Sequence, residues 1–240
     1  GEKADLVLTD PPYGISVGGG GKPYGKVGGD KPYGKGGGGG DPNNGGYPYG
    51  GLKKMSSGKG TVGGGGMIKA KLYSAIEGDD STDAARNALS VLTSIKNQIV
   101  FGGNYFTDFL PPSRCWIVWD KENTGYFADA ELAWTSFDKG VRLYHWYWNG
   151  LSRKGERKEE LRSRVHPTQK PVGLFKQILE DFSEPGDIVI DSFLGSGTTL
   201  IACENTGRKC RGVEISPDYC AVILQRFKDA TGKEPVRINE

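Results

Sequence analysis

The sequence has few of the residues from which many enzymes build their sites. It contains two histidines and four cysteines in 240 residues, and no two cysteines form a C-x-x-C pair. No cluster of these residues has the spacing of a metal site, which excludes a zinc deaminase, and no G-x-S-x-G elbow indicates a serine hydrolase. No apolar run reaches about 18 residues, so we expect no transmembrane helix and no membrane partner. The first residues are polar and charged, which predicts no secretory signal and a cytoplasmic location.

The chain also has little net charge, only +2. A value this small barely indicates a nucleic-acid partner by itself, but the charge is unevenly distributed. Residues 17–66 contain seven lysines and two aspartates, so this segment carries +5 and the remainder carries −3. The length suits one α/β domain with a sizeable core, and we expect a single catalytic domain over residues 1–240.

The first segment with a chemical pattern is Asp10-Pro11-Pro12-Tyr13, which follows an apolar run at residues 4–9. Two successive prolines lack the N–H donors that a sheet needs, so the predicted strand ends there. A carboxylate, free backbone carbonyls and an aromatic ring then lie at its carboxyl end. This set suits a flat ring with an amino group. A Pro-Pro turn capped by Asp10 is the alternative interpretation.

Residues 17–66, directly after this motif, are of low complexity. They contain runs of glycine and the near repeat Lys-Pro-Tyr-Gly-Lys at residues 22–26 and 31–35. Such a composition buries too little apolar surface to offset the entropy of ordering, which predicts a flexible inserted loop. Its lysines and tyrosines suit contacts with phosphates and bases, and the alternative is a passive linker or a replacement for a native loop.

The rest of the chain alternates strand-like and helix-like patterns. Short apolar runs bounded by Gly, Pro or Asp predict strands, and apolar residues three and four apart predict helices. This alternation predicts an α/β fold, with a largely parallel sheet covered by helices on both faces and ligands beyond the carboxyl ends of its strands. The expected strands are residues 4–9, 98–101, 115–119, 141–148, 187–191, 210–215 and 236–238. The expected helices run from residue 81 or 83 to 96, over 127–137, over 171–182, from 198 onward, and over 217–229.

A second motif occupies residues 191–199, between a predicted strand and a predicted helix. Gly195 and Gly197 permit a tight turn and a close approach of the backbone to a ligand. A dinucleotide fold would have a third glycine where Leu200 stands, and a phosphate-binding loop would have a lysine. Glu214 ends the next predicted strand, where the diol of a ribose would lie. These features fit a nucleoside without phosphates better than NAD or ATP.

With these motifs in place, the sequence resembles the amino-group DNA methyltransferases that use S-adenosylmethionine. Residues 10–13 are similar to their catalytic motif and residues 191–197 to their cofactor motif. Residues 166–171, His-Pro-Thr-Gln-Lys-Pro, are similar to the segment just before the cofactor strand. The catalytic motif comes first, as in the β arrangement of that family. The resemblance covers nearly all of the chain except residues 17–66. It implies a Rossmann-like methyltransferase fold of seven mostly parallel strands with a circularly permuted motif order.

The resemblance also implies roles for individual residues. Glu214 would accept hydrogen bonds from the ribose hydroxyls, and Thr168 and Lys170 would contact the carboxylate of the cofactor. Phe193 would pack near the adenosine and Ile215 would line the adenine pocket. The implied catalytic residues are Asp10, Pro11, Pro12 and Tyr13. The implied cofactor-binding residues are Thr168, Lys170, Asp191, Phe193, Gly195, Gly197, Thr198, Glu214 and Ile215.

The chemistry that these residues predict needs neither a histidine nor a metal. Hydrogen bonds from an exocyclic amino group to Asp10 and to the Pro11 carbonyl would localise the nitrogen lone pair and stabilise its developing positive charge. Tyr13 would stack on the base. A base inside a duplex cannot reach such a pocket, so we expect a flipped-out target base in DNA.

Several alternatives stay open from sequence alone. An aspartate at position 10 favours N6 of adenine, with N4 of cytosine as the alternative, because cytosine enzymes more often carry serine there. An RNA or protein methyltransferase of the same fold, or a catalytically idle DNA-binding module, is a more distant possibility. Residues 149–165 contain six basic residues that suit DNA phosphates, or else form a solvated charged helix. The family would place the protein in a bacterium or a phage, within restriction-modification, and a homodimer is possible.

Overall fold

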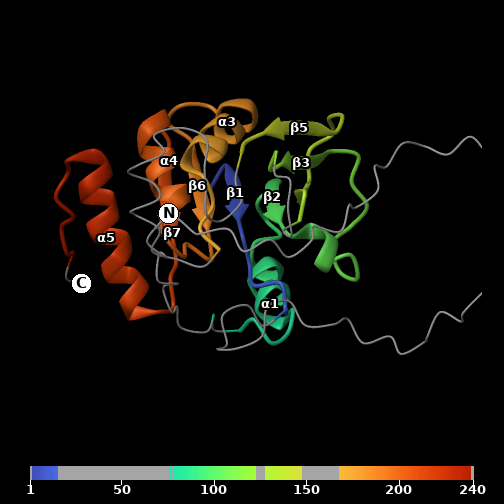
Figure 1. Ribbon diagram of the computed structural model, residues 1–240, viewed down its shortest axis with the longest axis horizontal. Coiled ribbons are helices and arrows are strands. Elements are labelled where there is room, and N and C mark those ends of the chain that lie inside the picture. The colour runs from blue at the N-terminus through green and yellow to red at the C-terminus, as the bar shows by residue number, and fades with distance from the viewer. Residues whose placement is uncertain (1, 16–75, 77, 123–127, 148–167, 239–240) are drawn as a thin grey trace, which may run out of the picture. The chain divides into compact units, whose positions relative to one another are not determined.

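Seven strands form one sheet in a computed structural model of the chain, which describes residues 2–15, 76, 78–122, 128–147 and 168–238. The strand order is β5-β3-β4-β2-β1-β6-β7 (Figure 1). Every neighbouring pair is parallel except the two that involve β4. The strands are β1 (Leu6–Thr9), β2 (Asn97–Phe101), β3 (Trp116–Asp120), β4 (Ala130–Thr135), β5 (Arg142–His145), β6 (Ile188–Asp191) and β7 (Lys209–Gly212).

Strand β1 lies in the interior of the sheet, between β2 and β6. Its four residues are all buried, as the continuous apolar run predicts for a strand covered on both faces. Thr9 pairs with Val100 of β2, and Val7 pairs with Ile190 of β6. This register brings the last residue of β1 level with the last residues of its neighbours, so the loops after β1 and β6 leave the sheet at the same edge.

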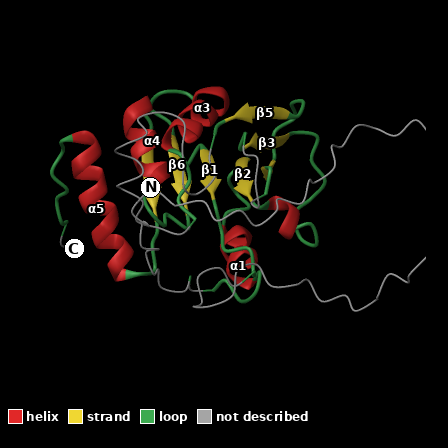
Figure 2. Cartoon of the chain, in the orientation of Figure 1, coloured by secondary structure: helices red, strands yellow, loops and turns green. Residues whose placement is uncertain are grey.

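Helices cover both faces of the sheet, which confirms the predicted layers. Helices α3 (Val172–Phe182) and α4 (Thr198–Thr206) lie together in Figure 2, and residues of both pack against β1, β2 and β3 in the larger core. Helix α1 (Asp83–Val91) packs through Ala85 and Leu89 against residues of β2 and β4 in a second core. Helix α5 (Pro217–Thr231) contacts α4.

The predicted helix at residues 127–137 is wrong, because β4 occupies residues 130–135 instead. Its Ala, Glu and Leu residues favour a helix, but the strand hydrogen-bonds to β3 on one side and β2 on the other. Ala133, Trp134 and Thr135 are buried in succession, a pattern of a strand enclosed on both faces. Tertiary pairing therefore overrides the local propensity, and β4 is the reversed strand of the sheet.

Smaller differences concern the ends of elements. Helix α1 ends at Val91 rather than at residue 96, and Leu92 caps it through a bond to the Leu89 carbonyl. Strand β7 ends at Gly212 rather than at 215, so Glu214 lies in the loop that follows. Residues 236–238 form no strand, and Val236 and Ile238 are exposed. An apolar alternation of three residues that pairs with no strand of the sheet is too short to hold a strand by itself.

Two predicted segments, residues 17–66 and 149–165, lie outside the described residues, as does the start of the 166–171 motif. Within the described part of the chain, no helix has both the length and the apolar character that a membrane span requires.

Candidate functional site

The site begins where β1 ends. Pro11 is buried and Pro12 half-buried directly after Asp10, and β1 stops at Thr9 as predicted. The hydroxyl of Thr9 donates a 2.8 Å hydrogen bond to Oδ1 of Asp191, the last residue of β6. This bond ties the loop with the first motif to the loop with the second. The structure therefore brings the two motifs together at the carboxyl edge of the sheet.

Both oxygens of the Asp10 carboxylate are engaged. The Tyr13 hydroxyl donates a 2.6 Å hydrogen bond to Oδ1, and the Lys170 ammonium donates one of 2.6 Å to Oδ2. Burial raises the pKa of Asp10, and the nearby Lys170 charge lowers it without cancelling that effect. Asp10 is thus a desolvated acceptor whose hydrogen-bond donors in this structure are Tyr13 and Lys170.

Tyr13 is held as a flat aromatic surface beside this carboxylate. Its ring stacks on Tyr105, with centroids 4.9 Å apart and planes 12° from parallel. Tyr105 ends the short 3-10 helix η1 (Gly103–Tyr105), and the Tyr13 ring lies against the backbone of Gly102. Burial, followed by the negative charge of Asp10, raises the pKa of Tyr13 well above its ordinary value. Its hydroxyl therefore remains a neutral donor.

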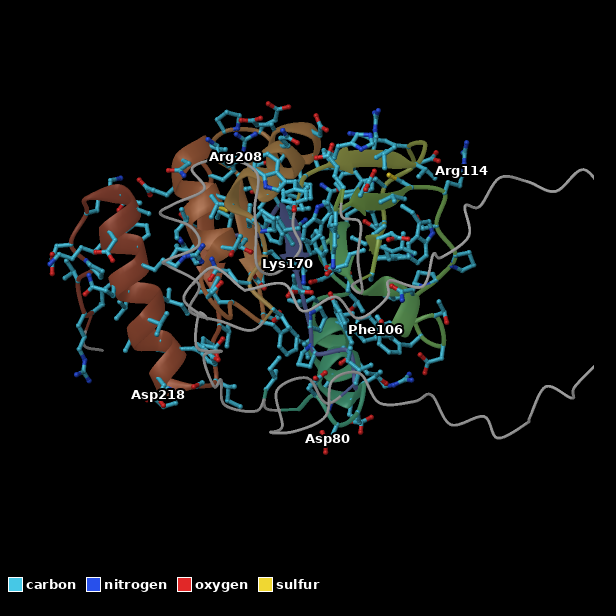
Figure 3. All side chains as sticks on the ribbon, in the orientation of Figure 1. Asp80, Phe106, Arg114, Lys170, Arg208 and Asp218 are labelled. Atoms are coloured by element: carbon cyan, nitrogen blue, oxygen red, sulfur yellow. The ribbon has the colours of Figure 1, made fainter. Side chains whose placement is uncertain are left out.

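Lys170, which was predicted to contact the carboxylate of the cofactor, lies beside Asp10 in this structure. Lys170 is labelled in Figure 3. Its side chain is buried, its ammonium contacts Asp10, and its Nζ also lies 3.3 Å from the Tyr13 hydroxyl. Its backbone carbonyl accepts a 3.1 Å hydrogen bond from Thr198 Oγ1, so the main chain, not the ammonium, meets the second loop. Although burial lowers it, the negative charges of Asp10 and Glu131 raise the pKa of Lys170 above its usual value.

Glu131, which sequence reasoning missed, is the second carboxylate of this cluster. Its Oε1 lies 2.6 Å from Lys121 Nζ, and its Oε2 lies 3.3 Å from Lys170 Nζ. Burial alone would raise the pKa of Glu131, but the two lysine charges outweigh it and lower the pKa below the usual range. The available signal was an acidic residue inside an apolar segment, and it was hidden by the prediction of a helix there.

The second motif forms a tight loop between β6 and α4. Gly195 and Gly197 have φ of +53° and +80°, a region that disfavours residues with a side chain. The Gly195 N–H donates a 2.8 Å hydrogen bond to Glu214 Oε2, and the Ser216 N–H donates one of 2.9 Å to Oε1. Glu214 is thus fixed beside the glycine turn, with carboxylate lone pairs left for a further donor.

The other predicted cofactor residues divide into two groups. Asp191 and Thr198 are buried and bonded inside the protein, and the Asp191 carboxylate accepts from Thr9, from Thr199 Oγ1 at 2.5 Å and from the Phe193 N–H at 3.1 Å. Phe193 and Thr168 are half-buried, whereas Ile215 is 74% exposed. The first group is bonded inside the loop, and the side chains of the second group are at least partly accessible to solvent.

The donors and acceptors of this loop fit the nucleoside part of S-adenosylmethionine. Glu214 offers a positioned carboxylate, as a ribose diol requires, and residues 192–197 contain no lysine or arginine for a phosphate. Glycine backbone, an aromatic ring and an exposed isoleucine lie on the same stretch of chain. The seven-stranded sheet with its covering helices has the Rossmann-like fold of the methyltransferases.

Comparison with known proteins finds a family that is similar to part of the chain. Residues 117–225, a little under half of the chain, match the family model of the N6 and N4 DNA methylases. This part of the chain is similar to a family whose members depend on S-adenosylmethionine.

Individual relatives match parts of the chain. A DNA adenine methyltransferase, YhdJ of Escherichia coli strain K12, is 47% identical over 66 residues, which are 28% of this chain and 22% of the relative. A putative methylase of the same strain, YubD, is 42% identical over 65 residues, 27% of this chain and 29% of the relative. The chain thus spans less than a third of the length of these two relatives.

One solved structure is similar over most of the fold. The cytosine-N4-specific PvuII DNA methyltransferase matches with a TM-score of 0.51 and 15% identity, over 95% of this chain and 84% of that chain. At this identity the match supports the fold alone.

Proposed function

We propose that this protein transfers a methyl group from S-adenosylmethionine to the exocyclic N6 amino group of an adenine in DNA. The observation that carries the proposal is the Thr9–Asp191 hydrogen bond of 2.8 Å, which holds the Asp10 loop and the glycine loop at one edge of the sheet. Group transfer between two bound molecules needs two sites held in fixed register.

Asp10 and the Pro11 carbonyl would receive the two hydrogens of the amino group. These bonds favour a pyramidal nitrogen whose lone pair is localised, and they stabilise the positive charge that develops on it. The desolvation of Asp10 strengthens this effect because a buried carboxylate interacts strongly with nearby charge. Tyr13 would offer its ring to the base, and the base would leave the duplex to reach it.

The glycine loop would hold the cofactor. Glu214 would accept from the ribose hydroxyls, Gly195 and Gly197 would allow the backbone to approach, and Phe193 and Ile215 would line the adenosine. When bound, S-adenosylmethionine supplies a methyl group that is already electrophilic. The residues of this chain then need only to bind, to align and to exclude water.

Two observations favour adenine over cytosine. The residue at position 10 is aspartate, and the relative YhdJ is named as an adenine methyltransferase. The complete set of Asp10, Tyr13, the two glycines and Glu214 supports an active enzyme over an idle DNA-binding module.

The test is transfer of labelled methyl to DNA, followed by analysis of the nucleosides. We expect N6-methyladenine from the wild type. Asp10→Ala should lower the transfer rate by about 10²–10³-fold, the range for loss of one group that stabilises transition-state charge.

Two controls accompany this test. S-adenosylhomocysteine should bind Asp10→Ala with wild-type affinity in calorimetry, and Asp229→Ala, an exposed aspartate on α5, should keep the full rate. Formation of N4-methylcytosine would change the assigned target base to cytosine. The absence of both a methylated product and cofactor binding would show that the protein is not this enzyme.

A further inference from the structure

Four charged side chains of alternating sign form a row at the edge of the sheet. They are Asp10 after β1, Lys170 before α3, Glu131 at the start of β4 and Lys121 just after β3. Lys170 Nζ lies 2.6 Å from Asp10 Oδ2 and 3.3 Å from Glu131 Oε2, and Lys121 Nζ lies 2.6 Å from Glu131 Oε1. The row is electrically neutral as a whole.

The position of Lys170 conflicts with the proposed chemistry. Its ammonium occupies the Asp10 oxygen to which the amino group of a base would donate. A cation there would also oppose the positive charge that develops on the base nitrogen. Lys170 must therefore leave Asp10 when the base binds, although a buried ammonium without a partner is costly.

Glu131 offers the place to which this ammonium would move. Among the described residues, Oε2 of Glu131 is a buried oxygen without a hydrogen bond, and its 3.3 Å approach to Lys170 Nζ lacks hydrogen-bond geometry. Lys121 meanwhile holds the other oxygen, which keeps the carboxylate ionised and its free oxygen turned toward Lys170. A second acceptor therefore lies 3.3 Å from the ammonium, in addition to Asp10.

We propose that Glu131 is a positioning residue that receives the Lys170 ammonium when the amino group of the target base takes its place on Asp10. The inference rests on the proposed function and adds a residue to the same site. Glu131 touches neither the base nor the cofactor in this scheme. It acts through Lys170, by making the exchange of donors on Asp10 possible without an unpaired buried charge.

The test compares Glu131→Gln with Glu180→Gln, an exposed glutamate on α3 that undergoes the same chemical change. Without the second carboxylate, Lys170 remains on Asp10 and competes with the base. The single-turnover rate of Glu131→Gln at saturating cofactor should fall at least about tenfold, equal to 1.4 kcal/mol. The affinity for S-adenosylhomocysteine should stay within about twofold of wild type, and Glu131→Asp should recover part of the rate.

The pH profile distinguishes positioning from a merely structural role. The charged or titratable groups around Asp10 are Tyr13 on its own loop, Lys170 before α3, Glu131 on β4 and Asp191 at the end of β6. Removal of the Glu131 charge lowers the pKa of Asp10, so the acid limb of the rate should move to lower pH although the maximal rate falls. Carbon-13 NMR of the Asp10 carboxyl would show the lower pKa of Asp10 in Glu131→Gln directly, in a measurement that needs neither ligand nor activity.

These experiments distinguish a failure of the Glu131 proposal from a failure of the proposed methyl transfer. A wild type without transfer rejects the function, while the NMR comparison still tests the link from Glu131 to Asp10. An active wild type with equally active Glu131→Gln overturns the inference. So does a Glu131→Gln variant whose rate, cofactor affinity and unfolding temperature fall together with an unmoved acid limb.

Discussion

Gly102 shows how a single residue fixes the aromatic surface of the site. It lies at φ +68°, and a Cβ built there would stand 2.1 Å from Cε1 of Tyr13. The ring can lie against this backbone only because no side chain intervenes. The glycine thus sets the plane of Tyr13, on which the proposed base would stack.

We predict that Gly102→Ala lowers the methyl-transfer rate more than backbone strain alone explains. The matched control is Gly232→Ala, at φ +70° with open space around the new Cβ. Both variants should lose roughly 1–2 kcal/mol of unfolding free energy through the left-handed conformation. Only Gly102→Ala displaces Tyr13, so only it should lose a large part of the rate in single-turnover assays. Equal rates in the two variants would contradict this role of Gly102.

At this scale, the sequence predicted those site residues whose roles follow from local pattern. Asp10 and Tyr13 follow a buried strand, and Gly195 and Gly197 form a turn between a strand and a helix. Lys170 was predicted to contact the cofactor, which stays a prediction, and its ammonium reaches a residue 160 positions away. No local pattern carries information on such a contact.

At the scale of elements, β4 is the segment that local propensity misjudges, and it brings Glu131 into the site. The other strands end at the edge where the motifs lie, whereas β4, being reversed, starts there. A prediction that looks for polar residues after strands therefore overlooks one at the beginning of a strand. The other α-helices and strands were found because apolar spacing and the flanking glycines and prolines agree with their tertiary positions, whereas the strand predicted at residues 236–238 does not form.

Arg208 joins the ends of two helices, and it is labelled near α3 and α4 in Figure 3. It is 8% exposed, and its guanidinium donates to the carbonyls of Leu179, Ser183 and Thr206 and to Ser183 Oγ. The last carbonyls of a helix have no partner within it, so a buried helix end needs such donors. The planar guanidinium of Arg208 supplies several N–H donors at once.

We expect Arg208→Leu to lower the unfolding free energy by about 2–4 kcal/mol, because it leaves several buried carbonyls without donors. Arg208→Lys should fall between this variant and the wild type. Arg211→Leu is the control, since Arg211 is exposed and pairs with Glu2 at the surface, and should cost at most about 0.5 kcal/mol. Urea unfolding measures all three. A loss from Arg208→Leu no larger than that from Arg211→Leu would refute the capping role.

At the scale of the whole molecule, Asp191 makes stability depend on pH. Burial is the main cause that raises its pKa from 3.8 to about 6, and bonds from Thr199, Phe193 and Thr9 lower it only in part. Between these two values the folded state binds a proton that the unfolded state has lost. The contribution of this group therefore weakens as pH rises from about 4 to about 6 and is constant above.

We predict that Asp191→Asn removes this dependence. The amide can still accept from Thr9 and Phe193, and it can donate to Thr199. Relative to wild type, the variant should gain up to about 3 kcal/mol of unfolding free energy between pH 4 and pH 7, from a shift of about two units. Unfolding by urea across this pH range measures the difference. A difference that is independent of pH would show that Asp191 is not the group responsible.

The pairing of β1 with β6 also determines when the site comes into existence. Thr9 and Asp191 are 182 residues apart in the chain, yet their strands are neighbours in the interior of the sheet. Closing so long a connection is slow, and contacts of this range form late in folding. On the ribosome, Asp10 is made before the other residues of the site, and Lys170, β6 and the glycine loop follow about 160 or more residues later. A nascent chain thus contains the residues proposed to bind the base long before it contains those proposed to bind the cofactor.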